Sequence, residues 1–162
     1  MKIYKYDLNK LPSFRNLKEL VDMRENFANP VAFRYKEKGQ IKDISASAWR
    51  QDIEALGTYL FASGIRNSKV ALIGENSYQW ILSYFAVVNG GNVIVPIDKE
   101  LPDGDIAALI RRSGADTLIY SDSYDDVAQS VGHLKLLKMY ILPEIPCLRC
   151  HFITPSHFRL VL

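Results

Sequence analysis

The stretch from Val70 to Asp98 constrains the fold more than any other part of the chain. Val70–Ile73 is a short apolar run, Tyr78–Asn89 is apolar on nearly every side, and Val93–Ile97 is a second run rich in β-branched residues. A strand, a helix and a second strand in this order form the crossover unit of a parallel sheet. Because none of the three segments has a clean polar face, we predict that all three are buried.

Before this unit, the pattern predicts one helix and a β-hairpin. The helix covers Asn16–Phe27, where apolar residues recur at helical spacing. Val31–Lys36 alternates between apolar and polar residues, which is typical of a half-buried strand. Ile41–Ile44 returns after a turn that contains Gly39, so the two segments predict an N-terminal hairpin.

A longer helix follows the hairpin. Ser45 or Ser47 is its expected N-cap, and the helix continues to about Ser63. Its apolar residues fall on one face, and they are Trp49, Ile53, Leu56 and Leu60. Gly64 follows, where a left-handed residue commonly ends a helix.

The alternation of strands and helices continues after Asp98. A helix is predicted from Leu101-Pro102-Asp103 up to Gly114, and a third strand at Thr117–Tyr120. Ser121 is the expected cap of one more short helix that starts at Asp122. These repeats predict an α/β fold made of parallel-sheet βαβ units with flanking helices and an N-terminal hairpin.

Composition excludes several classes of protein. The net charge of the 162 residues is +2 and no basic run is present, so no nucleic acid partner is expected. The N-terminus carries charges and a proline where a signal peptide would be apolar, and the most apolar window, Ile81–Val88, is too short for a transmembrane segment. We therefore expect a cytoplasmic protein without a membrane span. Two cysteines, Cys147 and Cys150, do not suggest a disulfide framework.

The character of the chain changes after Ser130. Residues 131–162 contain all three histidines and both cysteines but only one acidic residue, Glu144. The pattern therefore predicts residues 1–130 as a regular α/β segment and residues 131–162 as an aberrant or frame-shifted, poorly ordered tail. The hypothesis is a departure from the ancestral reading frame near Val131, and the alternative is a divergent but genuine segment.

The tail also holds the most conspicuous short motif of the chain. Cys147, Cys150 and His151 match the C-x-x-C-H pattern of covalent haem attachment, and with His157 they offer four zinc ligands. Haem attachment of this kind needs export, and the zinc ligands are crowded and lack a second knuckle. We favour a chance occurrence of the motif.

The turn after the first buried strand, Gly74–Ser77, invites a nucleotide-binding interpretation, because a glycine turn before a helix can bind phosphate. The turn matches neither common phosphate-binding motif, and the carboxylate of Glu75 would repel phosphate. We favour a plain strand-to-helix turn in which Asn76 or Ser77 caps the helix.

Three aromatic residues of the following helix, Trp80, Tyr84 and Phe85, are candidates for the wall of an apolar ligand pocket. Aromatic residues at this spacing on a buried helix more often belong to the core. We therefore favour a core role, with the pocket as the alternative.

Three acidic residues near the end of the regular pattern, Asp122, Asp125 and Asp126, resemble a metal cluster. They also lie in the first turn of a predicted helix, where the helix dipole favours negative charge. We favour the dipole interpretation. No nucleophile arrangement is predicted, because every histidine lies in the tail.

The run Val88–Pro102, VNGGNVIVPIDKELP, resembles an early motif of the AMP-forming adenylating enzymes, closest to the long-chain fatty acid–CoA ligases. The matching residues are Gly91, Val95, Pro96, Ile97 and Asp98. The segments Lys69–Trp80 and Asp103–Tyr120 also resemble the neighbouring elements of that family. The resemblance covers about Leu17–Ser130, in the family's order, and implies part of a larger N-terminal domain.

Such enzymes activate a carboxylic acid with MgATP to an acyl-adenylate and transfer the acyl group, usually to coenzyme A. The resemblance implies fatty acid, ATP, Mg and CoA as ligands of the intact enzyme, and none bound by this part alone. The family's phosphate loop, metal-binding Glu and catalytic Lys find no counterpart in residues 1–162. No catalytic, cofactor-binding or metal-binding residue is therefore carried over.

The favoured expectation is an N-terminal fragment of an acyl-CoA synthetase that is inactive alone. One alternative is a non-catalytic α/β module that binds a lipid or a protein partner. Another is a small nucleotide-binding domain of flavodoxin-like type.

Overall fold

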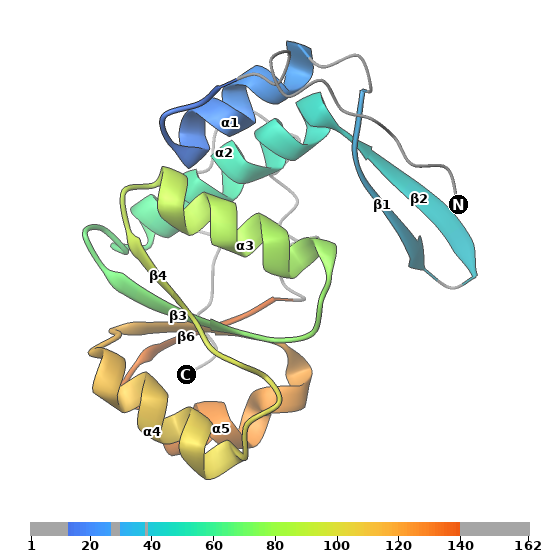
Figure 1. The fold of residues 1–162 in the computed structure, drawn as a ribbon. Helices are drawn as coiled ribbons and strands as arrows, with labels where there is room; N and C mark the ends of the chain where they lie inside the picture. Colours follow the sequence, from blue (N-terminus) through green and yellow to red (C-terminus); the bar gives the residue numbers. More distant parts are fainter. Residues whose placement is uncertain (1–12, 27–29, 38, 140–162) are drawn as a thin grey trace.

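The structure is a computed structural model that describes residues 13–26, 30–37 and 39–139. Its elements alternate between helices and strands along most of this length (Figure 1). They are α1 (Leu17–Met23), η2 (Arg24–Asn26), β1 (Val31–Glu37), β2 (Gln40–Ser45), α2 (Ala46–Ala62), β3 (Lys69–Ile73), α3 (Tyr78–Asn89), β4 (Val93–Pro96), α4 (Asp103–Ser113), β5 (Thr117–Tyr120), η3 (Asp122–Tyr124), α5 (Asp125–Ser130) and β6 (Lys135–Lys138).

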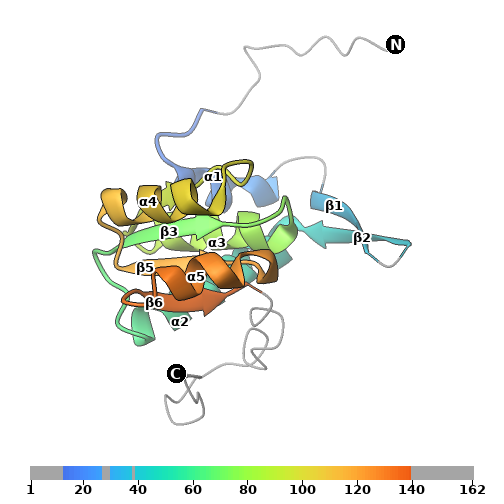
Figure 2. The ribbon, with the colours of Figure 1, turned by 90° about the horizontal axis from the view of Figure 1, so that it is seen from below.

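The centre of the fold is a four-stranded parallel sheet in the order β4-β3-β5-β6. Helices α1, α2 and α3 lie on one face of this sheet, and α4 and α5 lie on the other (Figures 1 and 2). The antiparallel β1–β2 hairpin forms a separate two-stranded sheet that projects from the end of α2 (Figure 1). The predicted α/β class, with its parallel sheet and N-terminal hairpin, is confirmed.

Two apolar cores pack against the two faces of the sheet. Val70, Leu72 and Ile119 belong to the core shared with α2 and α3, which we call the α2–α3 core. Ala71 and Leu118 belong to the core shared with α4 and α5, which we call the α4–α5 core. Neighbouring strand residues point to opposite faces, so β3 and β5 are covered on both sides. Fully burying a side chain such as Leu72 contributes roughly 1.5–3 kcal/mol.

Serine residues begin the two long helices at the expected places. The Oγ atom of Ser45 accepts a hydrogen bond from the Ala48 backbone N–H at 3.0 Å, so Ser45 rather than Ser47 caps α2. The Oγ atom of Ser77 accepts one from the Trp80 backbone N–H at 3.1 Å, so Ser77 rather than Asn76 caps α3. Gly64 has a φ of +80°, as predicted for the residue that ends the α2 region.

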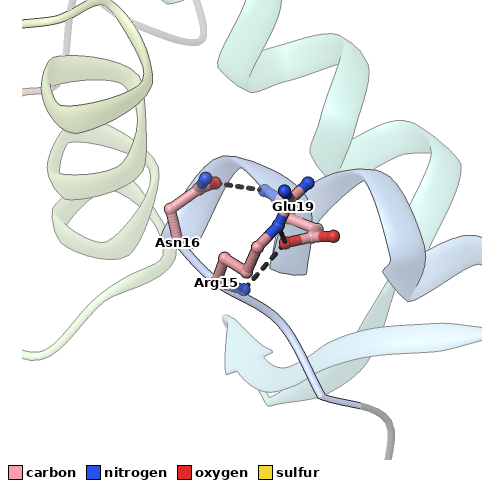
Figure 3. A network of polar contacts seen from close by, with 3 residues as sticks. All are labelled: Arg15, Asn16 and Glu19. Carbon is pink, nitrogen blue, oxygen red and sulfur yellow. Dashed lines mark hydrogen bonds and ion pairs between the residues drawn. The ribbon is translucent and has the colours of Figure 1, made fainter.

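Helix α1 begins with a compact polar network, which Figure 3 shows. The Oδ1 atom of Asn16 accepts a hydrogen bond from the Glu19 backbone N–H at 2.9 Å. The Glu19 carboxylate accepts one from the Arg15 backbone N–H at 2.7 Å. The α-helix ends at Met23 and a 3₁₀ turn continues to Asn26, so the observed helix is shorter than the predicted one. Phe27, the predicted end of the helix, lies outside the described residues.

Strand β4 corrects the prediction that the whole crossover unit is buried. Val93 is 56% exposed, and Ile94 and Val95 are only partly buried. Within the described residues, β4 pairs with β3 alone and forms one edge of the sheet. A β-branched run therefore gave the correct element but not its degree of burial.

Strand β6 lies beyond the point where the sequence pattern was expected to stop. Its residues pair in parallel with β5, and the backbone N–H of Met139 donates to the Tyr120 carbonyl oxygen at 2.8 Å. Val131 is fully buried and Met139 is 3% exposed. The Lys135 ammonium donates to the Ser63 carbonyl oxygen at the end of α2. Regular structure therefore continues to Lys138, because Leu136 and Leu137 supply an apolar strand between two lysines.

Candidate functional site at the carboxyl edge of the sheet

The topology of the sheet singles out one place for a site. The chain leaves β3 through α3 towards β4 on one side, and it leaves β5 through α5 towards β6 on the other side. Neighbouring strands whose connections run in opposite directions create a crevice outside their carboxyl ends. In this protein the crevice lies between the ends of β3 and β5.

An open hollow of about 310 Å³ occupies this position. The residues that follow β3, β5 and β6 line it, and they are Glu75, Ser77, Gln79, Ser121, Asp122, Ser123 and Met139. Most of these side chains are polar or acidic. We call this hollow the switch-point hollow.

Glu75 is the central charge of the switch-point hollow. The hydroxyls of Ser121 and Ser123 hold the pKa of the Glu75 carboxyl below its usual range, and the Lys99 ammonium acts in the same direction. The Ser121 oxygen is buried, and its contact with Glu75 falls outside the geometry of a standard hydrogen bond. Because its pKa is lowered, Glu75 is ionised at neutral pH and gives the hollow a negative charge.

Gly74 lies in a closely packed position. A Cβ atom at this position would overlap the methyl group of Met139 and lie 3.1 Å from the Ser121 oxygen. The ends of β3, β5 and β6 meet at this point, so a side chain would fit only if the end of the flexible Met139 side chain moved. Together with the Ser77 cap, this supports the interpretation of Gly74–Ser77 as a plain strand-to-helix turn.

The three predicted acidic residues, Asp122, Asp125 and Asp126, take part in an ion pair and in the first turn of a helix. The Asp125 carboxylate lies 2.6 Å from the Lys138 ammonium, while Asp122 lies 4.0 Å from it. Asp125 and Asp126 are in the first turn of α5. This supports the dipole and ion-pair interpretation, and residues 13–26, 30–37 and 39–139 contain no cluster suited to holding a metal ion.

The tail motif cannot be placed. Cys147, Cys150, His151 and His157 all lie outside the described residues. The haem and zinc interpretations of these residues remain predictions.

The three aromatic residues of α3 pack against the α2–α3 core, as the sequence analysis favoured. The Phe85 ring meets the Trp49 ring edge-on, with centroids 4.9 Å apart. Trp80 stacks on Tyr84 and also lines a second hollow of about 280 Å³ between the hairpin and the start of α3. Phe33 and Tyr78 are further walls of this aromatic hollow. The core and pocket interpretations are therefore compatible for Trp80.

Tyr78 joins the hairpin to the body of the fold. Its hydroxyl donates a hydrogen bond of 2.7 Å to the Asp52 carboxylate on α2. Burial and this carboxylate raise the pKa of the Tyr78 hydroxyl, so it stays a donor throughout the physiological range. Its ring stacks parallel to that of Tyr35 on β1, with centroids 6.2 Å apart.

The sequence analysis did not bring Glu75 together with Ser121 and Ser123. The signal was present, because polar residues follow both buried strands directly. Combining those positions requires knowing that β3 and β5 are neighbours, although β4 lies between them in the sequence.

The four parallel strands, covered by helices on both faces, define a doubly wound α/β domain. The sequence model described as AMP-binding enzyme matches residues 23–146. The chain belongs to the AMP-binding enzyme family. The match extends past Ser130, in agreement with the continuation of the sheet to β6.

Solved structures share this fold. The N-terminal domain of FACL13 from Mycobacterium tuberculosis, crystallised with an inhibitor, superposes with a TM-score of 0.68 and 19% identity, over 81% of this chain and 35% of that one. The N-terminal subdomain of NpsA from Klebsiella oxytoca, in complex with 3-hydroxybenzoyl-AMSN, superposes with a TM-score of 0.68 and 21% identity, over 82% of this chain and 32% of that chain.

Among curated proteins, a crotonobetaine/carnitine–CoA ligase from Proteus mirabilis is 23% identical over 128 residues. The matched region covers 76% of this chain and 25% of the ligase. The chain therefore spans about a quarter of this ligase and about a third of the two solved structures. No helix in the described part of the chain is long and apolar enough to cross a membrane.

Proposed function

We propose that this chain is the N-terminal segment of an AMP-forming acid–CoA ligase whose acid substrate is a fatty acid. The family match over residues 23–146 carries this proposal. The similarity to a CoA ligase and to the N-terminal domain of FACL13 supports the ligase class. Fatty acid as the substrate class rests on the resemblance of Val88–Pro102 to the long-chain ligases. In the intact enzyme, ATP, Mg and CoA would be the other ligands.

We also propose that the chain does not form acyl-adenylates alone. The switch-point hollow is where a doubly wound domain would present phosphate to a helix terminus. There the ionised Glu75 and the exposed Asp122 would repel a nucleotide phosphate. The switch-point hollow thus disfavours a bare phosphate, and we expect the nucleotide phosphates to be held by other parts of the enzyme.

ATP–pyrophosphate exchange tests this proposal on the purified chain. The assay would use acids of increasing chain length, with the full-length Proteus ligase and its own substrate as a positive control. We expect no exchange above background for any acid. Saturable exchange that disappears when the fold is disrupted, for example by Leu72→Asp, would contradict the proposed inactivity.

A second candidate function is that of a non-catalytic binding module. The aromatic hollow favours it, because Phe33, Tyr78 and Trp80 form an apolar cavity outside the switch-point hollow. Saturable fatty acid binding that does not depend on ATP, and that is weakened by Trp80→Ala, would support this function. Binding that Trp80→Ala leaves unchanged would remove its structural basis.

A nucleotide-binding domain of flavodoxin-like type is a third candidate. The order β4-β3-β5-β6 follows the flavodoxin-like order, which is the observation in its favour. The negative charge of Glu75 at the switch point is against it. We expect neither ATP nor flavin mononucleotide to bind in calorimetry, and micromolar binding of either one would favour this candidate.

We retain the proposals of a cytoplasmic location and of a departure from the ancestral reading frame. The family match ends at residue 146, so the second proposal now concerns residues 147–162. Reading the coding DNA of this end in the other two frames tests it. A family-like continuation in another frame would support the departure, and its absence would argue for a genuine divergent segment.

A further inference from the structure

The four parallel strands all start at one edge of the sheet, opposite the edge that holds the switch-point hollow (Figure 2). We call it the amino edge. Four segments enter the strands there, and they are residues 61–69, 90–93, 111–117 and 131–135. These segments contain one acidic residue, Asp116, and five lysine and arginine residues, which are Arg66, Lys69, Arg111, Arg112 and Lys135. The amino edge therefore has an excess of positive charge.

Two of these cations are held at the ends of helices. The Lys69 ammonium donates to the Ser113 carbonyl oxygen in the last turn of α4, at 3.1 Å. The Lys135 ammonium donates to the Ser63 carbonyl oxygen at the end of α2. Such contacts satisfy carbonyl groups that a helix leaves open, and the helix dipole favours them. They fix each ammonium group in place, but a neutral carbonyl oxygen does not cancel its charge.

The cations of the amino edge also lack carboxylate partners. Elsewhere in the described chain, six cations form ion pairs at 2.6–3.8 Å, and they are Arg15, Lys18, Arg34, Arg50, Lys99 and Lys138. At the amino edge, the side chains of Arg111 and Arg112 are exposed and form no ion pair or hydrogen bond with the described residues. The dipole of α4 explains why arginines lie at its end, but it does not explain why carboxylates are missing beside them.

Two exposed apolar side chains accompany these cations. Phe61 at the end of α2 and Val93 at the start of β4 are each 56% exposed. The backbone N–H of Val93 donates to the Ser68 carbonyl oxygen at 2.9 Å, so the start of β4 lies beside the segment that follows α2. In that segment, the Arg66 guanidinium lies 3.6 Å from the centre of the Phe61 ring. Single exposed apolar residues are common, but these two belong to the edge whose positive charge is not balanced.

The carboxyl edge of the sheet has the opposite charge. The segments that follow β3, β4 and β5 are residues 74–79, 97–105 and 121–126, and they contain one cation, Lys99. Their acidic residues are Glu75, Asp98, Glu100, Asp103, Asp105, Asp122, Asp125 and Asp126. A negatively charged surface would therefore attract the amino edge and repel the carboxyl edge.

We propose that the amino edge binds an anionic lipid surface, with Arg111 and Arg112 at the phospholipid headgroups and Phe61 and Val93 in the interface. Cations combined with aromatic and aliphatic side chains are the groups that hold proteins at such surfaces. A lipid surface requires no matched shape, which suits an edge assembled from four separate segments. In this orientation the switch-point hollow faces away from the lipid. The proposal does not depend on the ligase function.

Co-sedimentation of the 162-residue chain with vesicles tests the proposal. The anionic vesicles contain equal amounts of phosphatidylcholine and phosphatidylglycerol, and the neutral vesicles contain phosphatidylcholine alone. At low ionic strength we expect saturable binding to the anionic vesicles and at least tenfold weaker binding to the neutral ones. Binding should weaken steeply when salt is added, because salt screens the attraction between exposed charges.

Two double variants with the same loss of charge locate the contact. Arg111→Gln with Arg112→Gln should weaken binding at least tenfold, because one cation near an anionic surface contributes about fivefold in affinity. Arg34→Gln with Lys36→Gln, in the hairpin beyond the opposite edge, is the matched control and should change binding less than twofold (Figure 2). Circular dichroism confirms that both variants fold.

A third variant, Phe61→Ser, tests the apolar contribution. It keeps every cation and should weaken binding at least threefold, with the larger effect at high salt, where the charges are screened. If Phe61→Ser does not fold, Val93→Ser tests the same contribution from β4.

The proposal is overturned if the chain does not sediment with the anionic vesicles, or if it binds the neutral ones equally well. Equal weakening by the two double variants would also overturn it, because binding would then follow net charge and not this edge. Binding to soluble polyglutamate that the arginine variants abolish, without binding to vesicles, would replace the lipid surface by an acidic protein as the partner.

Discussion

The parallel sheet and the β1–β2 hairpin use the same backbone hydrogen bonding but differ in what covers them. In β3, Val70, Ala71, Leu72 and Ile73 have no exposed surface. In the hairpin, no residue with a described side chain is fully buried, and Ile41 is 70% exposed. An isolated two-stranded hairpin is at best marginally stable in water. The comparison indicates that the cores on the two sheet faces stabilise this fold, while the hairpin depends on its contacts with α2 and α3.

The largest expected effect comes from matched truncations in the two regions. Leu72→Ala in β3 should lower the free energy of unfolding by about 2–5 kcal/mol, because it removes a fully buried side chain and leaves a cavity. Ile41→Ala in the hairpin should change it by less than about 0.5 kcal/mol. Urea unfolding followed by circular dichroism measures both. Equal effects would show that the hairpin is as well packed as the sheet.

The next largest effect is expected at the junction of the two regions. Tyr78→Phe removes the hydrogen bond to Asp52 and should cost about 1–2 kcal/mol of unfolding free energy. Tyr35→Phe is the control, because it keeps the ring stack with Tyr78 and removes a hydroxyl with no hydrogen bond in the described part of the chain. If the two variants are equally stable in thermal unfolding, the Tyr78 hydroxyl does not join the regions.

The two regions should also differ, by a smaller amount, in how much stability they lose in acid. Serine hydroxyls lower the pKa of Glu75 in the body, and the Arg34 guanidinium lowers that of Asp43 in the hairpin. A carboxyl whose pKa is lower in the folded state stabilises the protein above its unfolded pKa. That contribution is lost as the pH falls through the folded value.

The corresponding variants are Glu75→Gln and Asp43→Asn. In Glu75→Gln, the free energy of unfolding should fall less steeply between about pH 5 and pH 3, because this variant lacks a carboxyl in the body of the fold that is protonated in acid. Asp43→Asn should leave the global acid curve unchanged, since the Arg34–Asp43 pair is exposed and lies in the hairpin, outside the two cores. Unfolding curves at several pH values measure both effects. The opposite ranking would place the acid-sensitive contact in the hairpin.

The smallest effect is expected for the exposed ion pair of the hairpin. The Arg34 Nε atom lies 2.7 Å from the Asp43 carboxylate, and both side chains are well exposed to solvent. Arg34→Met should leave global stability unchanged, because exposed pairs contribute little. Hydrogen exchange should become faster in β1 and β2 but not in β3. Faster exchange in β3 would show that the two regions unfold together.

Local signals predicted several elements to the residue. Tyr78–Asn89 and Thr117–Tyr120 have the bounds predicted from the sequence, because a capping serine, glycine turns and β-branched runs mark their ends. Strand β6 was missed, because four residues with two lysines give little pattern and gain their place by pairing with β5. The exposure of β4 was missed for a related reason, since it depends on how many strands lie beside it.

The sequence by itself determined the alternation of strands and helices, the caps, and the family resemblance carried by Val88–Pro102. These features depend on residues close together in the chain, where spacing and side-chain type are sufficient. Only the tertiary structure decided that Glu75 meets Ser121 and Ser123, and that four separate segments bring five cations to the amino edge. Those groupings depend on strand order and helix packing, which bring residues distant in the sequence to one place.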